Sequence, residues 1–437
     1  MPGYIPDIET KSLEEQTVFQ EQGLKSMLEY VAEHSTYYKR LFQEHHIEIG
    51  HIHHLSDLQK LPTTSKEDIQ LHNMDFLCVS ADQIAEYTAT SGTLGSPVSL
   101  ALTRGDIQRL AYNEYLSFEL MHIGPGDVVQ LMLTLDRQFM AGMAYYLGLK
   151  KNGATAVRTG PGLPSMQIDI IQRLKSTVLV AVPSFILKLI EYARQVHIDL
   201  NQLPVKKILC IGENIHNKDF SPNALGALMQ EAWPIAYYST YASTEMQTAF
   251  TECEAGQGGH HHPELIIVEI LDDEGRQLGP GEYGEVTITT LGVEGMPLLR
   301  YRTGDICCYY DTPCACGRKT KRLSPVSGRK QQMIKYKGTT LYPPAVYDVL
   351  NQFPQVKEYV VEVRTGDLGN DDLILHINTP LSADECERAL KPFLQSRLRV
   401  IPHINYLSTA EINDMQFPAG SRKAVRFIDQ RKSANHV

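Results

Sequence analysis

Three short motifs carry side chains that could bind a phosphorylated ligand. The segment 88–97 (TATSGTLGSP) combines hydroxyl side chains with glycines, and the free N–H groups and hydroxyls of such a loop can bind phosphate. The segment 241–245 (YASTE) ends in a carboxylate that could bind Mg²⁺, a cation that prefers oxygen ligands. The segment 301–305 (YRTGD) ends in a carboxylate that could accept hydrogen bonds from both hydroxyls of a ribose.

Each motif also has a plain structural explanation. The first could be a polar hairpin loop, and it lacks the Gly-Lys-Ser/Thr ending of a Walker loop. The second could be the capped start of a helix. The third could be a turn with Arg302 in a surface ion pair. No single motif decides between these interpretations.

Cysteine and histidine residues form a second group. Cys253 precedes the run 260–262 (HHH), and Cys314 and Cys316 follow later in the chain. Thiolate and imidazole ligands suit tetrahedral Zn²⁺, although the Cys-x-Cys spacing is tighter than the common two-residue gap. The alternatives are a dithiol turn and a histidine run in an exposed loop.

Strands and helices alternate in the part of the chain that must position these side chains. Apolar runs predict strands at 128–133, 155–157, 178–182, 207–211 and 235–237. Helical periodicity predicts helices between them, at 139–149, 167–174, 184–196 and 223–233. This alternation predicts parallel strands joined by helices, and ligands of such sheets bind beyond the carboxyl ends of the strands.

The flanking regions have different patterns. Residues 12–44 have the apolar period of a single helix. Segments 265–271 and 285–290, separated by a Gly/Pro-rich turn, predict antiparallel strands. From about residue 330 the pattern predicts a separate small α+β unit.

Composition narrows the class of protein. The 437 residues include 41 Lys+Arg and 51 Asp+Glu, a net charge of −10, which argues against a general nucleic-acid binder. Eight cysteines are too few for a disulfide scaffold of this length. The first residues lack the basic start and apolar core of a signal peptide, and no apolar run approaches the roughly 18 residues of a membrane helix, so we expect a cytoplasmic protein without a membrane partner.

One local charge run departs from the acidic balance. Residues 317–338 hold eight Lys and Arg residues and no acidic residue. Such a run could attract the phosphates of a ligand, although most of its members are expected to be solvated. Arg329 and Lys337 are the two that we single out.

Together the motifs resemble the adenylate-forming superfamily, which activates carboxylic acids with ATP, and within it the phenylacetate–CoA ligase branch. The three motifs occur in the family's order, and the resemblance covers nearly the whole chain. It extends to Gly212-Glu213-Asn214, to Gly328-Arg329 and to the C-terminal segment 421–426 (SRKAVR).

The resemblance implies a nucleotide site. Its members are Thr90, Ser91, Gly92 and Thr93 around the phosphates, Gly212, Glu213 and Tyr241 at the adenine, Thr244 at the phosphates, Asp305 at the ribose and Arg329 near the domain junction. Glu245 would bind Mg²⁺. Lys423 matches the catalytic lysine, whose ammonium would neutralise charge that develops between the carboxylate and the α-phosphorus.

The resemblance also implies three further sets of residues. Zinc ligands would be Cys253, His260, Cys314 and Cys316, a closed and therefore structural site. The acyl pocket would include Phe139, Met140 and Tyr145, which at helical spacing could equally belong to the core. Gln331 would be the hinge, and Lys337 and Gly338 would contact coenzyme A.

The expected fold is α/β, with two domains. Residues 1–328 would form a large N-terminal adenylation domain of parallel α/β sheets plus a β-rich part. Residues 329–437 would form a small, mobile α+β domain that carries the catalytic lysine. The expected partners are a small carboxylic acid, ATP with Mg²⁺, and CoA, with structural Zn²⁺ as a further cofactor; homodimer formation is left open.

The expected reaction is that of an acyl-CoA ligase for an aromatic or arylacetic acid. Two departures from the family pattern keep alternatives open. Ser96 stands where the family carries a lysine, and the hinge reads Gln331-Gln332 instead of Asp-Asp. The alternatives are acyl transfer to a carrier-protein thiol or an amine, and a non-catalytic nucleotide-binding homologue. The retained Lys423, Asp305 and Glu245 favour an enzyme.

Overall fold

The computed structural model describes residues 4–90, 98–366, 371–418 and 424–431. Contacts divide the chain into two compact units. The first holds most of the chain up to Val326, and the second begins at Ser327 and includes two short stretches, Asn223–Leu225 and Gly304–Ile306. The border that we predicted between residues 328 and 329 stays a prediction.

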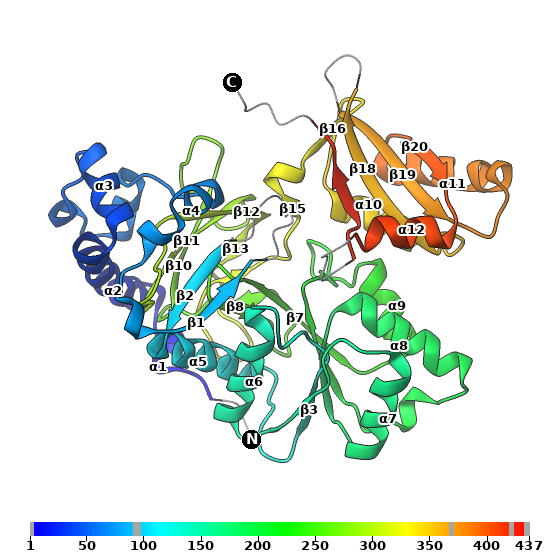
Figure 1. The fold of residues 1–437 in the computed structure, drawn as a ribbon, viewed down its shortest axis with the longest axis horizontal. Coiled ribbons are helices and arrows are strands. Elements are labelled where there is room, and N and C mark those ends of the chain that lie inside the picture. The colour runs from blue at the N-terminus through cyan, green and yellow to red at the C-terminus, as the bar shows by residue number, and fades with distance from the viewer. Residues whose placement is uncertain (1–3, 91–97, 367–370, 419–423, 432–437) are drawn as a thin grey trace. The chain divides into compact units, whose positions relative to one another are not determined.

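A six-stranded sheet lies at the centre of the first unit (Figure 1). Its strand order is β4-β3-β5-β6-β7-β8, and all neighbours are parallel except β7 and β8. The strands are β3 (Val128–Leu131), β4 (Thr155–Arg158), β5 (Val178–Ala181), β6 (Lys207–Ile211), β7 (Ala236–Ser243) and β8 (Thr248–Thr251). The predicted parallel α/β class is confirmed.

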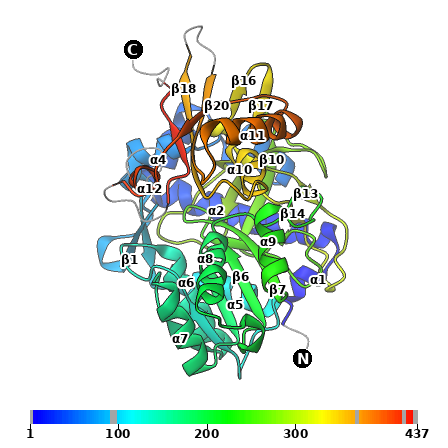
Figure 2. The ribbon, with the colours of Figure 1, turned by 90° about the vertical axis from the view of Figure 1, so that its right-hand side faces the viewer.

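Helices cover both faces of this sheet. They are α5 (Arg104–Leu120), α6 (Met140–Asn152), α7 (Pro164–Leu174), α8 (Pro183–Gln195) and α9 (Ala224–Ala232). In the strand order, β4 lies on one side of β3 and β5 lies on the other. The connection from β3 to β4 and the connection from β4 to β5 therefore run in opposite directions across the sheet. Because such crossovers are right-handed, α6 and α7 must lie on opposite faces, as Figure 1 shows; α8 is seen in front of the sheet in Figure 2.

The N-terminal helical region differs from the prediction of one helix over 12–44. The structure has α2 (Leu13–His34) and α3 (Thr36–Glu44), separated at Ser35. Ser35 has extended backbone angles, and its hydroxyl accepts a hydrogen bond from the Tyr38 N–H at 3.3 Å. A capping serine therefore ends one helix and starts the next within a continuous apolar pattern. Two shorter helices flank this pair, α1 (Asp7–Thr10) and α4 (Lys66–His72).

Smaller sheets complete the first unit. They are formed by β1 (Ile84–Ala89) and β2 (Ser99–Thr103), by β10 (Ile266–Leu271), β11 (Gly284–Thr290) and β12 (Tyr301–Cys307), and by β13 (Tyr309–Tyr310), β14 (Arg322–Leu323) and β9 (Gly259–His260). Strand β15 (Gly328–Arg329) pairs with Asp305 and Ile306 of β12, and these residues belong to the second unit. The predicted antiparallel pairing of 265–271 with 285–290 is confirmed by β10 and β11. Four short 3-10 helices precede β1, at Ile49–His51, Leu55–Lys60, Asn73–Phe76 and Ala81–Gln83.

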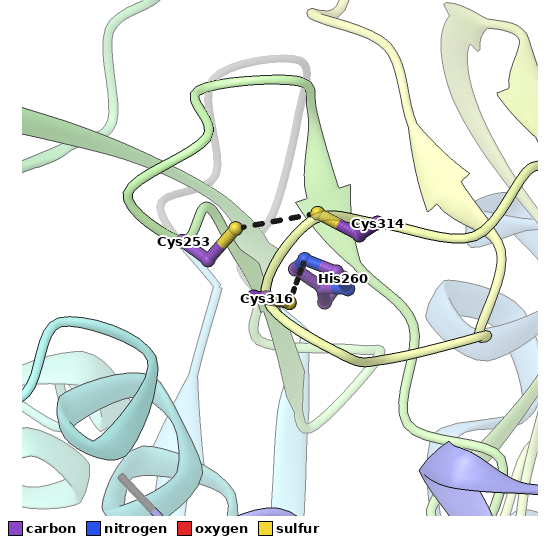
Figure 3. A group of neighbouring side chains, drawn as sticks. All are labelled: Cys253, His260, Cys314 and Cys316. Carbon is purple, nitrogen blue, oxygen red and sulfur yellow. Dashed lines mark hydrogen bonds between the residues drawn. The ribbon is translucent and has the colours of Figure 1, made fainter. Parts of the chain in front are cut away.

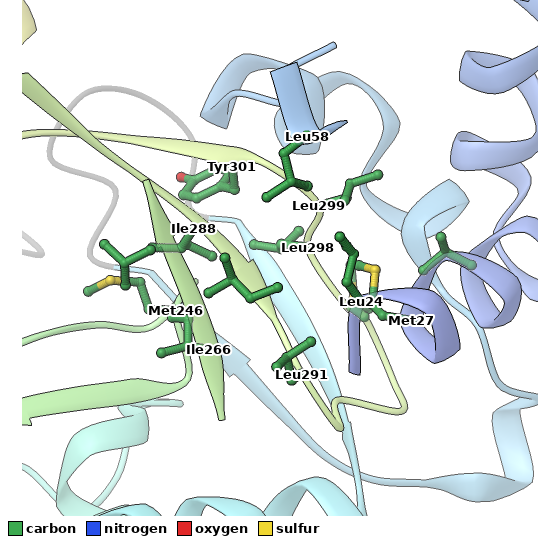
Figure 4. Close-up of a cluster of buried hydrophobic side chains, with 14 of the residues drawn as sticks. Leu24, Met27, Leu58, Met246, Ile266, Ile288, Leu291, Leu298, Leu299 and Tyr301 are labelled. Atoms are coloured by element: carbon green, nitrogen blue, oxygen red, sulfur yellow. The ribbon is translucent and has the colours of Figure 1, made fainter. Parts of the chain in front are cut away.

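A buried apolar core joins helix α2 to the β-rich part (Figure 4). Leu24 and Met27 of α2 share it with Ile266 of β10, Ile288 of β11 and Leu298. Burying these side chains contributes roughly 1.5–3 kcal/mol each. Tyr301, the first residue of β12 and of the third predicted motif, belongs to the same core.

The second unit is a four-stranded sheet with order β20-β19-β18-β21, accompanied by a short hairpin. Its elements are β16 (Ile334–Tyr336), β17 (Thr339–Leu341), α10 (Pro343–Asn351), β18 (Glu358–Thr365), β19 (Asp371–Asn378), α11 (Ala383–Leu398), β20 (His403–Tyr406), α12 (Thr409–Gln416) and β21 (Phe427–Asp429). Leu390 and Leu394 of α11 share a core with Val361 and Leu375 of the sheet. The expected α+β pattern is confirmed. Within the described residues of both units, no helix is long and apolar enough to span a membrane.

Candidate active site and metal centre

The carboxyl ends of β6 and β7 carry two of the predicted nucleotide segments. Gly212 follows β6 with a φ of +75°, a conformation that favours glycine. The next residue, Glu213, accepts a hydrogen bond through Oε2 from the Ser184 N–H at 2.8 Å. This carboxylate therefore also holds the first turn of α8, where the helix dipole favours negative charge.

The segment 241–245 lies partly inside a strand. The sequence predicted a strand only over 235–237, whereas β7 continues to Ser243, so Tyr241 is a strand residue. Its ring stacks on Phe250 of the neighbouring β8, with centroids 5.9 Å apart. A small pocket beside these rings is also lined by Glu252 and by Leu323–Pro325. No helix follows, which excludes the helix-cap interpretation: Thr244–Gln247 form the turn between β7 and β8.

Glu245 is buried in that turn, with 8% of its surface exposed. Its Oε1 accepts a hydrogen bond from the Tyr301 hydroxyl at 3.5 Å. The same oxygen lies 3.8 Å from Nζ of Lys66, the first residue of α4. Two of the three motifs thus meet at one carboxylate, and a lysine that sequence reasoning did not select stands beside it. The one signal for Lys66 in the sequence is its place at the start of a helix that Ser65 could cap.

The third motif, 301–305, forms most of β12 and is not a turn. Arg302 binds Glu285 through Nε at 2.8 Å, and Asp305 is buried. Nε of Arg329 donates a hydrogen bond to Oδ1 of Asp305 at 3.1 Å, across the pairing of β12 with β15. Asp305 and Arg329, both predicted as nucleotide ligands, are therefore neighbours.

The phosphate-loop prediction is described only at its first residue. Thr90 is buried at the end of β1, and its hydroxyl accepts a hydrogen bond from the Val98 N–H at 3.1 Å. This contact joins the two described residues that flank segment 91–97. Ser91, Gly92, Thr93 and Ser96 lie outside the described residues, as does Lys423.

The three predicted acyl-pocket residues lie directly before α6 or in its first half. Phe139 is half-buried immediately before the helix. Met140 packs in a cluster with Leu102 and Leu110. Tyr145 is buried, with its ring edge-on to Phe118 at 6.0 Å. Met140 and Tyr145 therefore have the packing of core residues, and their role in a pocket stays a prediction.

A buried carboxyl group that the sequence did not single out lies in the same region. Glu114 of α5 accepts a hydrogen bond from Asn113 at 3.1 Å, while its Oε2 has no hydrogen-bond partner among the described residues. Burial raises the pKa of Glu114 to about 8. The side chain is therefore largely protonated at neutral pH.

The predicted hinge and coenzyme A residues lie in the second unit. Gln331 is exposed in a 3-10 turn (Lys330–Gln332), and its carbonyl accepts a hydrogen bond from Arg431 at 3.0 Å. Lys337 and Gly338 form the turn between β16 and β17, both with positive φ. Nζ of Lys337 donates to the Ile401 carbonyl at 3.3 Å.

The four predicted zinc ligands come together in the first unit (Figure 3). Sγ of Cys253 lies 3.5 Å from Sγ of Cys314, and Sγ of Cys316 lies 3.5 Å from Nε2 of His260. All four donor atoms lie within 4.8 Å of one another. Zn–S bonds of about 2.3 Å in a tetrahedron would place neighbouring sulfurs about 3.8 Å apart, so the donor set fits such an ion in both chemistry and spacing.

Local structure brings these donors into position. The turn from Cys314 to Arg318 is closed by the Cys314 N–H, which donates to the Arg318 carbonyl at 2.9 Å, and by Gly317 with a φ of +94°. His260 lies in β9, where it pairs with Arg322 of β14. The neighbouring Cys253 and Cys314 thiols, together with His260, lower the pKa of Cys316. The cluster therefore favours a thiolate, the form of cysteine that binds metals.

The family model of AMP-binding enzymes matches residues 17–295, and the chain therefore belongs to this family. This match confirms that the chain is an enzyme of the adenylate-forming class. Its curated relatives include the phenylacetate-coenzyme A ligase of Thermus thermophilus, 28% identical over 384 residues, which cover 86% of this chain and 85% of the relative. The phenylacetate-coenzyme A ligase of Escherichia coli is 25% identical over 440 residues, 98% of either chain. The resemblance to this branch is confirmed.

Solved structures share the fold. A 2-hydroxyisobutyryl-CoA ligase in its postadenylation state matches with a TM-score of 0.84 at 22% identity, covering 98% of this chain and 94% of the other. An anthranilate CoA ligase in complex with anthranoyl-AMP matches with a TM-score of 0.59 at 17% identity, covering 80% and 67%. The predicted two-part α/β architecture is that of known adenylate-forming ligases.

Proposed function

We propose that this chain is an AMP-forming acid–CoA ligase. A carboxylate would attack the α-phosphorus of ATP to give an acyl-adenylate and pyrophosphate. The thiol of CoA would then attack the acyl carbon, forming a thioester and releasing AMP. The observation that carries this proposal is the match to a phenylacetate-coenzyme A ligase over 98% of the chain.

The carboxylate of Glu245 is the proposed ligand of the Mg²⁺ that accompanies ATP. Its burial and its contact with the Tyr301 hydroxyl fix the position of the oxygens. We assign Lys66 as a cation for the ATP phosphates, because its ammonium lies 3.8 Å from Glu245 and Ser96 replaces the lysine that the family carries in the phosphate loop. A fixed positive charge at this place would stabilise charge on the leaving pyrophosphate.

Asp305 is the proposed ribose ligand. A buried, ionised carboxylate is a strong acceptor for two hydroxyl groups. Arg329, which binds Oδ1 of Asp305, would hold that carboxylate in place. Lys423 is the proposed catalytic lysine, and Gln331 the hinge that lets the second unit serve both half-reactions, with Lys337 and Gly338 at coenzyme A.

Zinc is proposed as a structural cofactor held by Cys253, His260, Cys314 and Cys316. Three thiolates and an imidazole leave no open coordination position, so such an ion would support the fold and take no part in the reaction. The favoured acid is aromatic or arylacetic, because relatives over most of the chain act on phenylacetate by name.

The decisive experiment is acid-dependent exchange of labelled pyrophosphate into ATP, screened over a panel of aryl, arylacetic and short aliphatic acids. At least one acid should give exchange, and Lys423→Ala should reduce it by at least a hundredfold. Lys391→Ala is the control, since this partly exposed lysine pairs only with the nearby Glu387 among the described ion pairs. No exchange with any acid would refute the proposal. Once an acyl-adenylate forms, CoA, a carrier-protein thiol and simple amines are compared as acceptors.

A further inference from the structure

An arginine next to the proposed zinc ligands is buried although its neighbours in sequence suggest a solvated charge run. Arg318 is only 3% exposed. Its guanidinium donates from Nε to Oε2 of Glu9 at 2.5 Å, from Nη2 to the Tyr4 carbonyl at 3.1 Å, and from Nη1 toward Sγ of Cys316 at 3.8 Å. One side chain thus connects a metal ligand to the N-terminal segment.

Glu9 is completely buried and serves this arginine from a helix of only four residues. Its second oxygen, Oε1, lies 2.5 Å from Nδ1 of His262. The backbone joins the same two segments, because the Lys319 N–H donates to the Glu9 carbonyl at 2.8 Å. The N-terminal segment is itself anchored, since the Tyr4 N–H donates to Glu119 of α5 at 2.6 Å.

The net charge of the proposed zinc centre explains why the positively charged Arg318 can be buried beside it. Three thiolates and one neutral imidazole around Zn²⁺ leave a net charge of −1. A buried charge of this kind is costly unless a partner of opposite sign lies close to it. Arg318 supplies that charge beside Cys316, and Glu9 in turn orients the guanidinium by a charge-assisted hydrogen bond.

We propose that Arg318 and Glu9 are positioning residues of the metal centre, so that the N-terminal segment 4–10 controls how firmly the ion is held. This inference rests on the proposed zinc centre and is independent of the ligase reaction. Hydrogen-bond partners of metal ligands typically change metal affinity by 10–100-fold when removed. Arg318 is near Cys316 in sequence, whereas Glu9, which binds Arg318, lies near the other end of the chain, where no local motif indicates such a role.

The test measures zinc transfer from the purified full-length protein to the chromophoric chelator 4-(2-pyridylazo)resorcinol. Arg318→Gln should release zinc at least about tenfold faster than the wild type, and Glu9→Gln should also accelerate release. Arg318→Lys should fall between Arg318→Gln and the wild type, because lysine keeps the charge but cannot bind Glu9 and Cys316 together.

The matched control is Arg300→Gln. Arg300 is equally buried and binds Glu269 through two nitrogens, at 3.0 and 2.8 Å, so its loss tests for general destabilisation. Cobalt-substituted protein gives a second readout: the thiolate-to-cobalt absorption should shift in Arg318→Gln and remain unchanged in Arg300→Gln. If either arginine variant is recovered unfolded, Glu9→Gln and Glu269→Gln repeat the comparison.

Equal release rates and identical cobalt spectra for the two arginine variants would overturn the role of Arg318. Equal behaviour of Glu9→Gln and Glu269→Gln would overturn the role of Glu9. A wild-type protein that retains neither zinc nor cobalt would overturn the metal centre itself, whereas pyrophosphate exchange by the same sample would leave the ligase proposal intact.

Discussion

Nζ of Lys66 lies 3.8 Å from Oε1 of Glu245, in an ion pair between the start of helix α4 and the turn that follows β7. The Tyr301 hydroxyl donates to the same oxygen. A carboxylate suited to Mg²⁺ and an ammonium suited to phosphate thus stand side by side. Lys66 is therefore the cation that we propose for the ATP phosphates, since the sequence has Ser96 where the family carries a lysine.

Lys66→Gln is therefore expected to weaken the handling of ATP. The Michaelis constant for ATP in pyrophosphate exchange should rise about tenfold, equivalent to about 1.4 kcal/mol. The Michaelis constant for the acid should change much less, because Lys66 is assigned to the phosphates. Both constants are measured with the best acid of the panel.

Lys60→Gln is the control for Lys66, since Lys60 is an exposed lysine nearby in sequence that pairs with Asp57. It should leave both Michaelis constants unchanged. Introducing lysine at Ser96 into the Lys66→Gln protein should restore part of the lost ATP affinity. A Lys66→Gln enzyme with wild-type constants would contradict the assignment.

Asp305→Asn should abolish the enzyme's preference for ATP over 2′-deoxy-ATP, which lacks one of the two ribose hydroxyls. The wild type is expected to use 2′-deoxy-ATP at least about tenfold less well than ATP, because each hydrogen bond to a charged group contributes roughly 1.5–3 kcal/mol. In Asp305→Asn the two nucleotides should become nearly equal as ATP activity falls. The measured quantity is the ratio of kcat/KM for the two nucleotides.

Glu285→Gln provides the comparison for Asp305, because Glu285 is a neighbouring buried carboxylate that binds Arg302. Its nucleotide ratio should equal that of the wild type. An unaltered ratio in Asp305→Asn would show that the ribose is held elsewhere.

Cys316→Ala should remove the metal. Zinc content, measured by elemental analysis, is expected to fall from one ion per chain to a small fraction, and the melting temperature should fall with it, because a structural zinc contributes directly to folding free energy. Cys308→Ala is the control, since Cys308 is buried outside the ligand cluster. Full zinc occupancy in Cys316→Ala would remove this cysteine from the ligand set.

Glu114 should give the protein a pH-dependent stability that glutamine removes. Burial raises the pKa of Glu114 from 4.5 to about 8, so the folded state keeps a proton that the unfolded state releases between these values. Stability therefore falls as pH rises through this range, by at most about 1.4 kcal/mol per pH unit. Glu114→Gln should gain stability relative to the wild type from pH 5 to pH 8 in urea unfolding.

Glu33→Gln is the reference for Glu114, because Glu33 is largely exposed. Its stability should follow the wild-type pH profile. If Glu114→Gln also follows that profile, the carboxyl of Glu114 ionises in the folded protein as readily as in the unfolded chain.

The central sheet could be predicted because its strands are short, apolar and separated by helices of clear periodicity. The predictions failed where polar residues continue a strand. β7 extends through Ser239 and Thr240 because it is hydrogen-bonded on one side to β6 and on the other to β8. The break between α2 and α3 was likewise not predicted, because Ser35 lies within an apolar helical pattern. Its hydroxyl caps the second helix.

The candidate site likewise contains residues that could be predicted from the sequence and residues that could not. The proximity of Cys253, His260, Cys314 and Cys316 was predictable because a family pattern groups them. Lys66 was not, because Glu245 is distant in sequence; a bridge between Thr64 and Tyr301 brings the start of α4 near the tyrosine that contacts Glu245. The basic run 317–338 suggested solvated charges, yet Arg318 and Arg322 are buried. Burial of a charge depends on partners distant in sequence, such as Glu9, which composition does not reveal.

The short distance between Cys253 and Cys314 has a consequence for biosynthesis. These sulfurs are 3.5 Å apart although 61 positions separate the residues, and strands β9 to β13 lie between them in the sequence. An ion bridging the two would close this long loop in the newly made chain as well, and closing a loop lowers the entropy of the unfolded ensemble. The yield of folded enzyme would then follow the zinc supply of the cell that makes it, quite apart from the enzyme's supply of ATP or acid.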